Sequence, residues 1–299
     1  MGGGGDVVGA LALARFCESL GIEARLGGVA WERIVIDPEP GPRPLAEIRG
    51  GRRLDGAVIA DGATTTAQGV PFAEARMAGH LGGETALIDV TGGPAGAAAG
   101  LASAAEALGC DLLILVDVGG DVLAHGDEPE LASPLCDAVM LAALGRLGDR
   151  IPSLLGVIGP GCDGELSPSE VLERTAELAA AGAWLGSFSV SPDVASELEA
   201  AAAEIPTEAS LMIARCARGA LGPAELRGGR RTAELGPVGA LCFFFDPAAT
   251  LGAAVPLAGA VADADSIESA RDALATLGVR TELDFERERA AELATDQRL

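Results

Sequence analysis

Short apolar runs alternate along the chain with stretches in which apolar residues recur at helical spacing. The clearest runs span residues 57–60, 85–88, 112–116 and 154–158, and each is followed by a turn that contains glycine. Continuous apolar runs separated by helices are typical of parallel strands buried on both faces. The pattern therefore predicts an α/β fold: a Rossmann-like three-layer sandwich with a mostly parallel sheet.

Helical spacing of apolar residues predicts the elements that connect these strands and follow them. The predicted helices span residues 7–20, 71–80, 95–108, 133–147, 167–182, 192–204, 208–219 and 266–277. Further strands are expected at 22–31 and 240–245, and a charge-dense ending at 281–289. No linker marks a boundary, so we expect a single α/β domain over residues 1–299, within which 186–299 could form a C-terminal subdomain.

A glycine loop opens the sequence and leads directly into the first predicted helix. Free backbone N–H groups in such a loop hold anions, so Gly3, Gly4, Gly5 and Asp6 are candidate ligand-binding residues. The competing interpretation is a tight turn with close helix packing. Such loops normally follow a β-strand, and here the first strand is missing. We therefore expect a gap in the sheet, or a partner that supplies the strand, and early melting.

Acidic residues follow the predicted strands in or beside glycine turns. They are Asp61, Asp89, Asp117, Asp121, Asp163 and Glu165. Right-handed connections between parallel strands would place these turns along one edge of the sheet, where ligands of α/β sheets bind.

The densest polar segment, residues 115–137, carries the candidate catalytic residues Asp117, Asp121 and His125. Carboxylates at a strand end can bind Mg²⁺ or accept protons, and a histidine transfers protons near neutral pH. Asp163 and Glu165 are candidate metal ligands if their strand neighbours that of Asp117; a solvated turn is the alternative.

Further ligand-binding candidates come from the glycine turns after three of the predicted strands. These residues are Asp61, Asp89, Thr91, Gly92, Gly119 and Gly120. Capping of the following helix is the alternative for Thr91.

Composition excludes several kinds of chemistry. The chain has no lysine, so its 21 basic residues are all arginine, and a Walker lysine or lysine-linked pyridoxal phosphate is excluded. A formal charge of -23 argues against a nucleic-acid or anionic membrane partner. The six cysteines form no Cys-x-x-Cys motif, and no signal peptide or membrane-spanning run is found. We expect a cytoplasmic protein, with homo-oligomerisation left open.

Several motifs together resemble an uncharacterised prokaryotic family, largely archaeal, named domain of unknown function 1152. They are Gly2–Ala10, Trp31-Glu32-Arg33 with Asp37-Pro38, Asp117–Asp121, Ser133–Asp137, Asp163–Leu166 and Thr281–Asp284. The resemblance implies a shared site without a named reaction, and a strand before the glycine loop. A fainter likeness relates residues 9–21 and 119–130 to D-glutamate cyclase-like proteins.

These observations favour a small-molecule enzyme of lyase or hydrolase type, with a carboxylate-rich, Mg²⁺-binding site and an anion-binding glycine loop. A non-catalytic nucleotide- or metabolite-binding protein is the alternative. A nicotinamide-dependent oxidoreductase is a further one, although Gly3, Gly5 and Val8 complete only part of the dinucleotide fingerprint.

Overall fold

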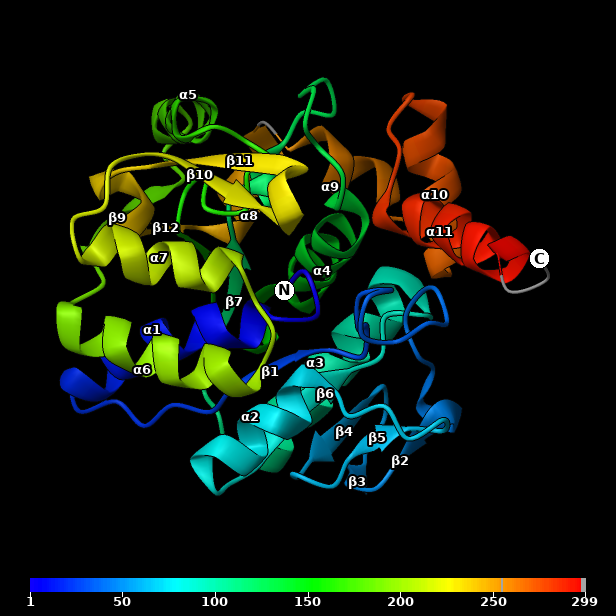
Figure 1. Ribbon diagram of the computed structural model, residues 1–299. Coiled ribbons are helices and arrows are strands. Elements are labelled where there is room, and N and C mark those ends of the chain that lie inside the picture. The colour runs from blue at the N-terminus through cyan, green and yellow to red at the C-terminus, as the bar shows by residue number, and fades with distance from the viewer. Residues whose placement is uncertain (254, 297–299) are drawn as a thin grey trace.

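The computed structural model describes residues 1–253 and 255–296 as a mixed α/β protein (Figure 1). Two four-stranded sheets form its centre, and two two-stranded pairs lie beside them. The strands are β1 (Gly27–Val29), β2 (Ile48–Arg49), β3 (Arg52–Arg53), β4 (Ala57–Ala60), β5 (Thr65–Thr66), β6 (Thr85–Ile88), β7 (Leu113–Val118), β8 (Ser153–Ile158), β9 (Trp184–Ser189), β10 (Gly222–Leu226), β11 (Arg231–Leu235) and β12 (Leu241–Phe245).

Helices cover both sheets. The α-helices are α1 (Asp6–Ser19), α2 (Ala73–Leu81), α3 (Gly93–Leu108), α4 (Pro134–Leu147), α5 (Pro168–Ala180), α6 (Pro192–Glu204), α7 (Ala209–Ala217), α8 (Pro247–Ala253), α9 (Pro256–Val261), α10 (Ile267–Thr276) and α11 (Glu282–Asp296). Short 3-10 helices are η1 (Leu45–Glu47), η2 (Asp121–Leu123), η3 (Gly148–Arg150), η4 (Arg227–Gly229) and η5 (Pro237–Ala240). Within the described ranges, no helix is long and apolar enough to cross a membrane.

The first sheet has the strand order β1-β6-β4-β3. Strand β1 pairs parallel with β6, whereas β4 is antiparallel to both β6 and β3. The four residues of β4 and of β6 are all buried, because α2 and α3 pack against this sheet. Alanine and glycine occupy much of the α3 surface and let this helix lie close to the sheet and to α4.

The second sheet has the strand order β7-β8-β12-β9. Strands β7 and β8 pair parallel, and β12 runs antiparallel between β8 and β9. Helices α1 and α4 contact β7. Few aromatic residues are available, and one of their contacts is the stack of Phe16 on Phe188, with ring centroids 4.2 Å apart.

The strand pairings correct the predicted architecture. Instead of one mostly parallel sheet, the described residues form two separate four-stranded sheets of mixed direction and two two-stranded antiparallel pairs. The periodicity of a strand shows whether its faces are buried but not the direction of its neighbour, so the apolar run of β12 did not reveal its antiparallel pairing. Most predicted helices are confirmed within a few residues, but the expected charge-dense ending is helix α11.

Candidate functional site

The parallel pairing of β7 with β8 brings together two of the acidic turns. Asp117 lies opposite Val157 and Val118 opposite Ile158, so both strands end at the same level. The turn after β7 carries Asp121 and the turn after β8 carries Asp163. From the sequence we expect these turns to meet if the two strands are neighbours, and the parallel pairing of β7 with β8 confirms that condition.

Glycine permits the close approach of these two turns. Gly119 has φ of +121°, and a Cβ atom on it would lie 2.2 Å from Cγ of Asp163. Its carbonyl accepts a 2.8 Å hydrogen bond from the N–H of Gly161, which fastens one turn to the other. At Gly120 a Cβ would lie 2.7 Å from the Val171 side chain. We predicted both glycines to bind ligand. Close packing is enough to explain why glycine occupies these two positions.

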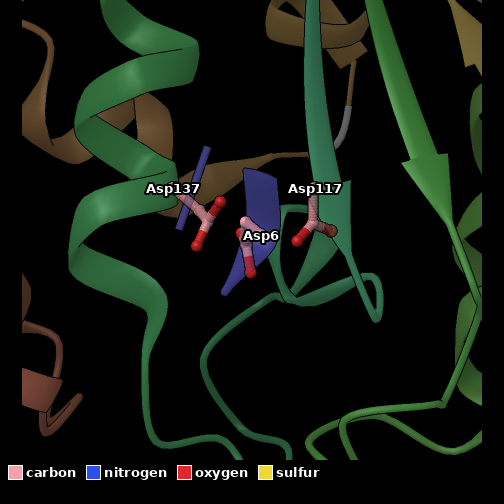
Figure 2. Close-up of side chains that lie close together, drawn as sticks. All are labelled: Asp6, Asp117 and Asp137. Carbon is pink, nitrogen blue, oxygen red and sulfur yellow. The ribbon is translucent and has the colours of Figure 1, made fainter. Parts of the chain in front are cut away.

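One set of three carboxylates, here named the first acidic group, comes from three different elements. Asp6 lies in the first turn of α1, Asp117 near the end of β7 and Asp137 in the first turn of α4. One oxygen from each lies within 4.8 Å of the other two, and the side chains point toward one another (Figure 2). Asp117 and Asp137 are each only 1% exposed.

Two members of the first acidic group each have a carboxylate oxygen that lacks the hydrogen bond a buried carboxylate normally receives. Oδ2 of Asp117 and Oδ1 of Asp137 are buried without a hydrogen-bond partner. Asp6 differs, because its Oδ2 accepts a 2.7 Å hydrogen bond from the N–H of Gly2. Buried, unpaired carboxylate oxygens are unfavourable unless a proton or a cation compensates them.

A second acidic group consists of Asp121, Asp163 and Glu165, whose oxygens also approach within 4.8 Å of one another. Glu165 is well satisfied: it accepts hydrogen bonds from the N–H groups of Ala132 and Ser133, both at 2.8 Å. It also forms a 2.8 Å ion pair with Arg231, on β11. Glu165 therefore fastens the turn before α4 to the β10–β11 hairpin.

Burial and mutual repulsion raise the pKa values of most of these acids. Burial raises the pKa of Asp117 to about 6. It also raises the pKa values of Asp121 and Asp137 well above the ordinary value, and repulsion from neighbouring aspartates adds to the effect. Glu165 differs, because Arg231 and the Ser133 hydroxyl outweigh burial and lower its pKa. Glu165 is thus the acid whose negative charge is best compensated, whereas burial also raises the pKa of Asp163, its neighbour in the second acidic group.

The nearest positive charge to the first acidic group is the Met1 ammonium, 3.5 Å from Oδ2 of Asp6. It also donates a hydrogen bond to the carbonyl oxygen of Val116 on β7. The Arg33 guanidinium lies close by and donates a 2.9 Å hydrogen bond to the carbonyl of Gly2. The loop before α1 is thus held against both β7 and the segment after β1.

The Gly2–Gly5 loop positions Asp6 through internal contacts. The N–H of Gly2 bonds to Asp6, and that of Gly4 donates a 2.9 Å hydrogen bond to the Trp31 carbonyl. At Gly3 a Cβ would lie 2.8 Å from the same carbonyl oxygen, and at Gly5 one would lie 2.4 Å from Cβ of Thr207. These contacts agree with the interpretation as a tight turn; anion binding by Gly3, Gly4 and Gly5 stays a prediction.

Two predicted residues lie away from the acidic groups. Because β4 is antiparallel to β6, its last residue Ala60 pairs with Thr85 at the start of β6. Asp61 therefore lies at the opposite edge of the sheet from Asp89. The prediction that all these acidic turns lie along one edge is wrong for Asp61. His125 follows η2, but its ring pairs with Glu177 of α5, with Nε2 3.2 Å from Oε2.

Asp89, Thr91 and Gly92 form a local turn before α3. One oxygen of Asp89 accepts hydrogen bonds from the N–H of Thr91 at 2.8 Å and its hydroxyl at 2.6 Å. The other accepts a 2.8 Å bond from the N–H of Leu45. Thr91 does not cap α3. The N-cap residue of this helix is Gly92, so no side chain makes a capping hydrogen bond there. The Asp89 carboxylate is thus committed to ordering these loops.

Asp137 is a residue of the first acidic group that sequence reasoning missed, although it lies in the Ser133–Asp137 motif. An acid in the first turn of a helix that starts with Ser-Pro is ordinarily explained by the helix dipole. The free N–H groups of that turn instead bond to an acid distant in the sequence. Glu282, on α11, accepts hydrogen bonds from the N–H groups of Leu135 at 3.0 Å and Cys136 at 2.8 Å. The observation that marks Asp137 as a candidate ligand is its burial, which the local sequence does not indicate.

Replacing Gly119 by alanine tests how tightly the two turns are built. Its Cβ would displace Asp163, so Gly119→Ala should cost at least about 2 kcal/mol more unfolding free energy than Gly182→Ala. Gly182 is a matched control, because it has φ of +77° but nothing within 4 Å of an added Cβ. Urea unfolding measures both. Equal losses would show that the close approach is unimportant.

Comparison with known proteins identifies a family for this chain. The family model described as "Protein of unknown function (DUF1152)" matches residues 1–290. No curated protein and no solved structure matches the chain. The motifs of the first acidic group lie within the matched residues. The chain therefore belongs to the DUF1152 family.

Proposed function

We propose that the protein is a divalent-cation-dependent enzyme of lyase or hydrolase type that acts on a small molecule. The observation that carries this proposal is the state of Asp117 and Asp137, whose oxygens Oδ2 and Oδ1 are buried and unpartnered. Together with Asp6 they form a set of oxygen ligands of the kind that Mg²⁺ prefers. A cation bound there would supply the charge compensation that the first acidic group lacks.

The arrangement supports distinct roles for neighbouring acids. Asp6, Asp117 and Asp137 would hold Mg²⁺, which keeps several waters when few protein ligands bind it and can polarise a substrate oxygen. Asp121 lies beside this group, close enough to Asp117 and Asp137 for their charges to raise its pKa, and would exchange a proton with the substrate. Asp163 and Glu165 would position Asp121 through the joined turns. We leave His125 out of this machinery because its ring pairs with Glu177.

The alternatives receive less support. A dinucleotide would need the loop N–H groups for its pyrophosphate, and those of Gly2 and Gly4 already have internal partners. The acidic surroundings of the loop would also repel a phosphate in the absence of a metal. A non-catalytic metabolite-binding protein would use the same cation site, and metal-dependent turnover of a substrate would distinguish the two. The six free cysteines suit a reducing compartment such as the cytoplasm.

Cation binding can be tested directly on protein stripped with a chelator. Titration with Mn²⁺, followed by electron paramagnetic resonance, should show one tight site that Asp137→Asn weakens by at least about tenfold, or 1.4 kcal/mol. Asp61→Asn is the matched control and should leave binding unchanged, because Asp61 is exposed at the opposite sheet edge. Equal affinities of the two variants would contradict the proposed site.

The same variant should separate binding from folding. Removing one of three repelling carboxylates should leave the metal-free Asp137→Asn protein at least as stable as the wild type. A role confined to structure would instead predict a lower melting temperature without any effect on cation binding.

The pH dependence of the cation effect is a further test. Burial raises the pKa of Asp117 to about 6, above its unfolded value, so its contribution to metal-free stability is present below about pH 4 and is lost as pH rises through 6. Ligands must be deprotonated to bind metal, so Mg²⁺ should raise the melting temperature more at pH 8 than at pH 5. Thermal unfolding with and without Mg²⁺ measures this; an equal shift at both pH values would contradict it.

A further inference from the structure

Two arginine side chains reach the acidic groups from different parts of the chain. Arg33 follows β1, and its Nη2 donates a 2.9 Å hydrogen bond to the carbonyl oxygen of Gly2. Arg227 lies in η4, between β10 and β11, and its Nη2 lies 3.4 Å from Oε1 of Glu165. The N–H of Gly2 bonds in turn to Asp6. Each arginine therefore lies beside one of the two acidic groups.

The glycine loop before α1 connects the two arginines. Gly4–Gly5 contacts both Arg33 and Thr207: added Cβ atoms would lie 3.4 Å from Cγ of Arg33 and 2.4 Å from Cβ of Thr207. The residue after Thr207, Glu208, accepts a 2.7 Å hydrogen bond from the backbone N–H of Arg227. Both arginines are thus anchored around the same loop.

The charge of Arg33 is not neutralised by a direct partner. Its hydrogen bond goes to a neutral carbonyl, and no carboxylate of residues 1–253 and 255–296 pairs with it. Burial opposes the charge of Arg33, but Glu282 and Glu286 outweigh burial and raise its pKa. Both glutamates are bonded elsewhere, Glu282 to two N–H groups of α4 and Glu286 to Nε1 of Trp31 at 2.9 Å. Arg33 therefore stays positively charged and open to a further anion.

Arg227 is also left with an incomplete ion pair. Oε1 of Glu165 already receives the Ser133 hydroxyl at 2.6 Å and lies 2.8 Å from Nη1 of Arg231. The contact of Arg227 with the same oxygen is longer, at 3.4 Å, and its side chain stays 46% exposed. Partial burial and repulsion from Arg231 and Arg33 lower the pKa of Arg227. A bound anion would relieve this repulsion.

The backbone at Arg227 has a conformation that arginine rarely adopts. Its φ is +52°, and within the described ranges no other residue except glycine has a positive φ. Gly228 and Gly229, which follow it, also have positive φ values, so glycine would suit position 227 with less strain. Strained residues of this kind cluster at ligand-binding sites. The side chain, rather than the turn, explains an arginine here.

We propose that Arg33 and Arg227 bind a phosphate group of the substrate beside the acidic groups, so that the substrate is a phosphorylated small molecule. This inference rests on the proposed function, because a bound cation would offset the negative charge that otherwise repels a phosphate. Guanidinium groups bind phosphate through paired, charge-assisted hydrogen bonds, and Mg²⁺ is commonly held by one or two carboxylates together with substrate phosphates. A carboxylate offers two oxygens, whereas a phosphate has enough for both arginines and the cation.

The test measures binding of inorganic phosphate by equilibrium dialysis, with Mg²⁺ and, in parallel, in chelator. Arg227→Gln should weaken phosphate binding by at least about tenfold, because a hydrogen bond between charged groups is lost. Arg230→Gln is the matched control and should leave binding unchanged. Arg230 is exposed in the same turn and, in the part of the chain that the structure describes, forms no ion pair with either acidic group.

Two further variants separate binding from folding. Arg227→Gly suits the positive φ, so it should weaken phosphate binding as much as Arg227→Gln without a lower melting temperature. Arg33→Gln should weaken phosphate binding as well. Sulfate, which is also tetrahedral and doubly charged, should compete with phosphate, and acetate at the same concentration should not.

Equal phosphate affinities of the Arg227→Gln and Arg230→Gln proteins would overturn the proposal, as would a wild type that binds no phosphate in either buffer. Competition by acetate as strong as that by sulfate would identify a carboxylate subsite and overturn the phosphate class. Arg227→Gln should still bind Mn²⁺ as tightly as the wild type does. Absence of Mn²⁺ binding would therefore contradict the cation site alone, and absence of an arginine effect in either buffer would contradict this proposal alone.

Discussion

Repulsion between buried carboxylates is the constraint on which the rest of the structure depends. Asp117 and Asp137 lie almost fully out of solvent, close to Asp6 and to each other, and two of their oxygens have no partner. Such an arrangement opposes folding unless a proton, the Met1 ammonium or a bound cation offsets it. The surrounding elements hold the three side chains together in spite of this cost, which is typical of functional sites.

The scaffold that holds them is itself well satisfied. Glu165 and Glu282 both accept backbone N–H groups at the start of α4, the helix that carries Asp137. Asp89 orders the loop before α3 in the same way. Acids that build the framework thus have partners, whereas Asp117 and Asp137 of the first acidic group each have a buried oxygen without one. This difference separates structural carboxylates from candidate ligands in a chain with many of both.

Much of the fold could be predicted from the sequence, because apolar periodicity is a local property. It located β4, β6, β7 and β8 and most helices to within a few residues. Strand direction could not be predicted in the same way. Because β4 runs antiparallel to β6, Asp61 lies at the opposite end of these strands from Asp89. Nothing in the short apolar run of β4 indicates its direction.

The candidate site was predicted in part for the same reason. Asp117 lies near the end of β7, and Asp121, Asp163 and Glu165 follow β7 or its parallel neighbour β8, so the rule for strand ends applies to them. Asp137 was missed because it follows no strand, and its position depends on how α4 packs against β7. His125 was selected because it is close in sequence to Asp121, but the chain turns after η2 and carries its ring to Glu177.

The most direct test of the cation site is a crystal structure of the protein soaked in Mn²⁺, with anomalous diffraction recorded to locate the metal. We expect an anomalous peak about 2.0–2.3 Å from carboxylate oxygens of Asp117 and Asp137, the range expected for this kind of ion. A map with no peak there at saturating Mn²⁺, or with peaks confined to exposed acids, would contradict it.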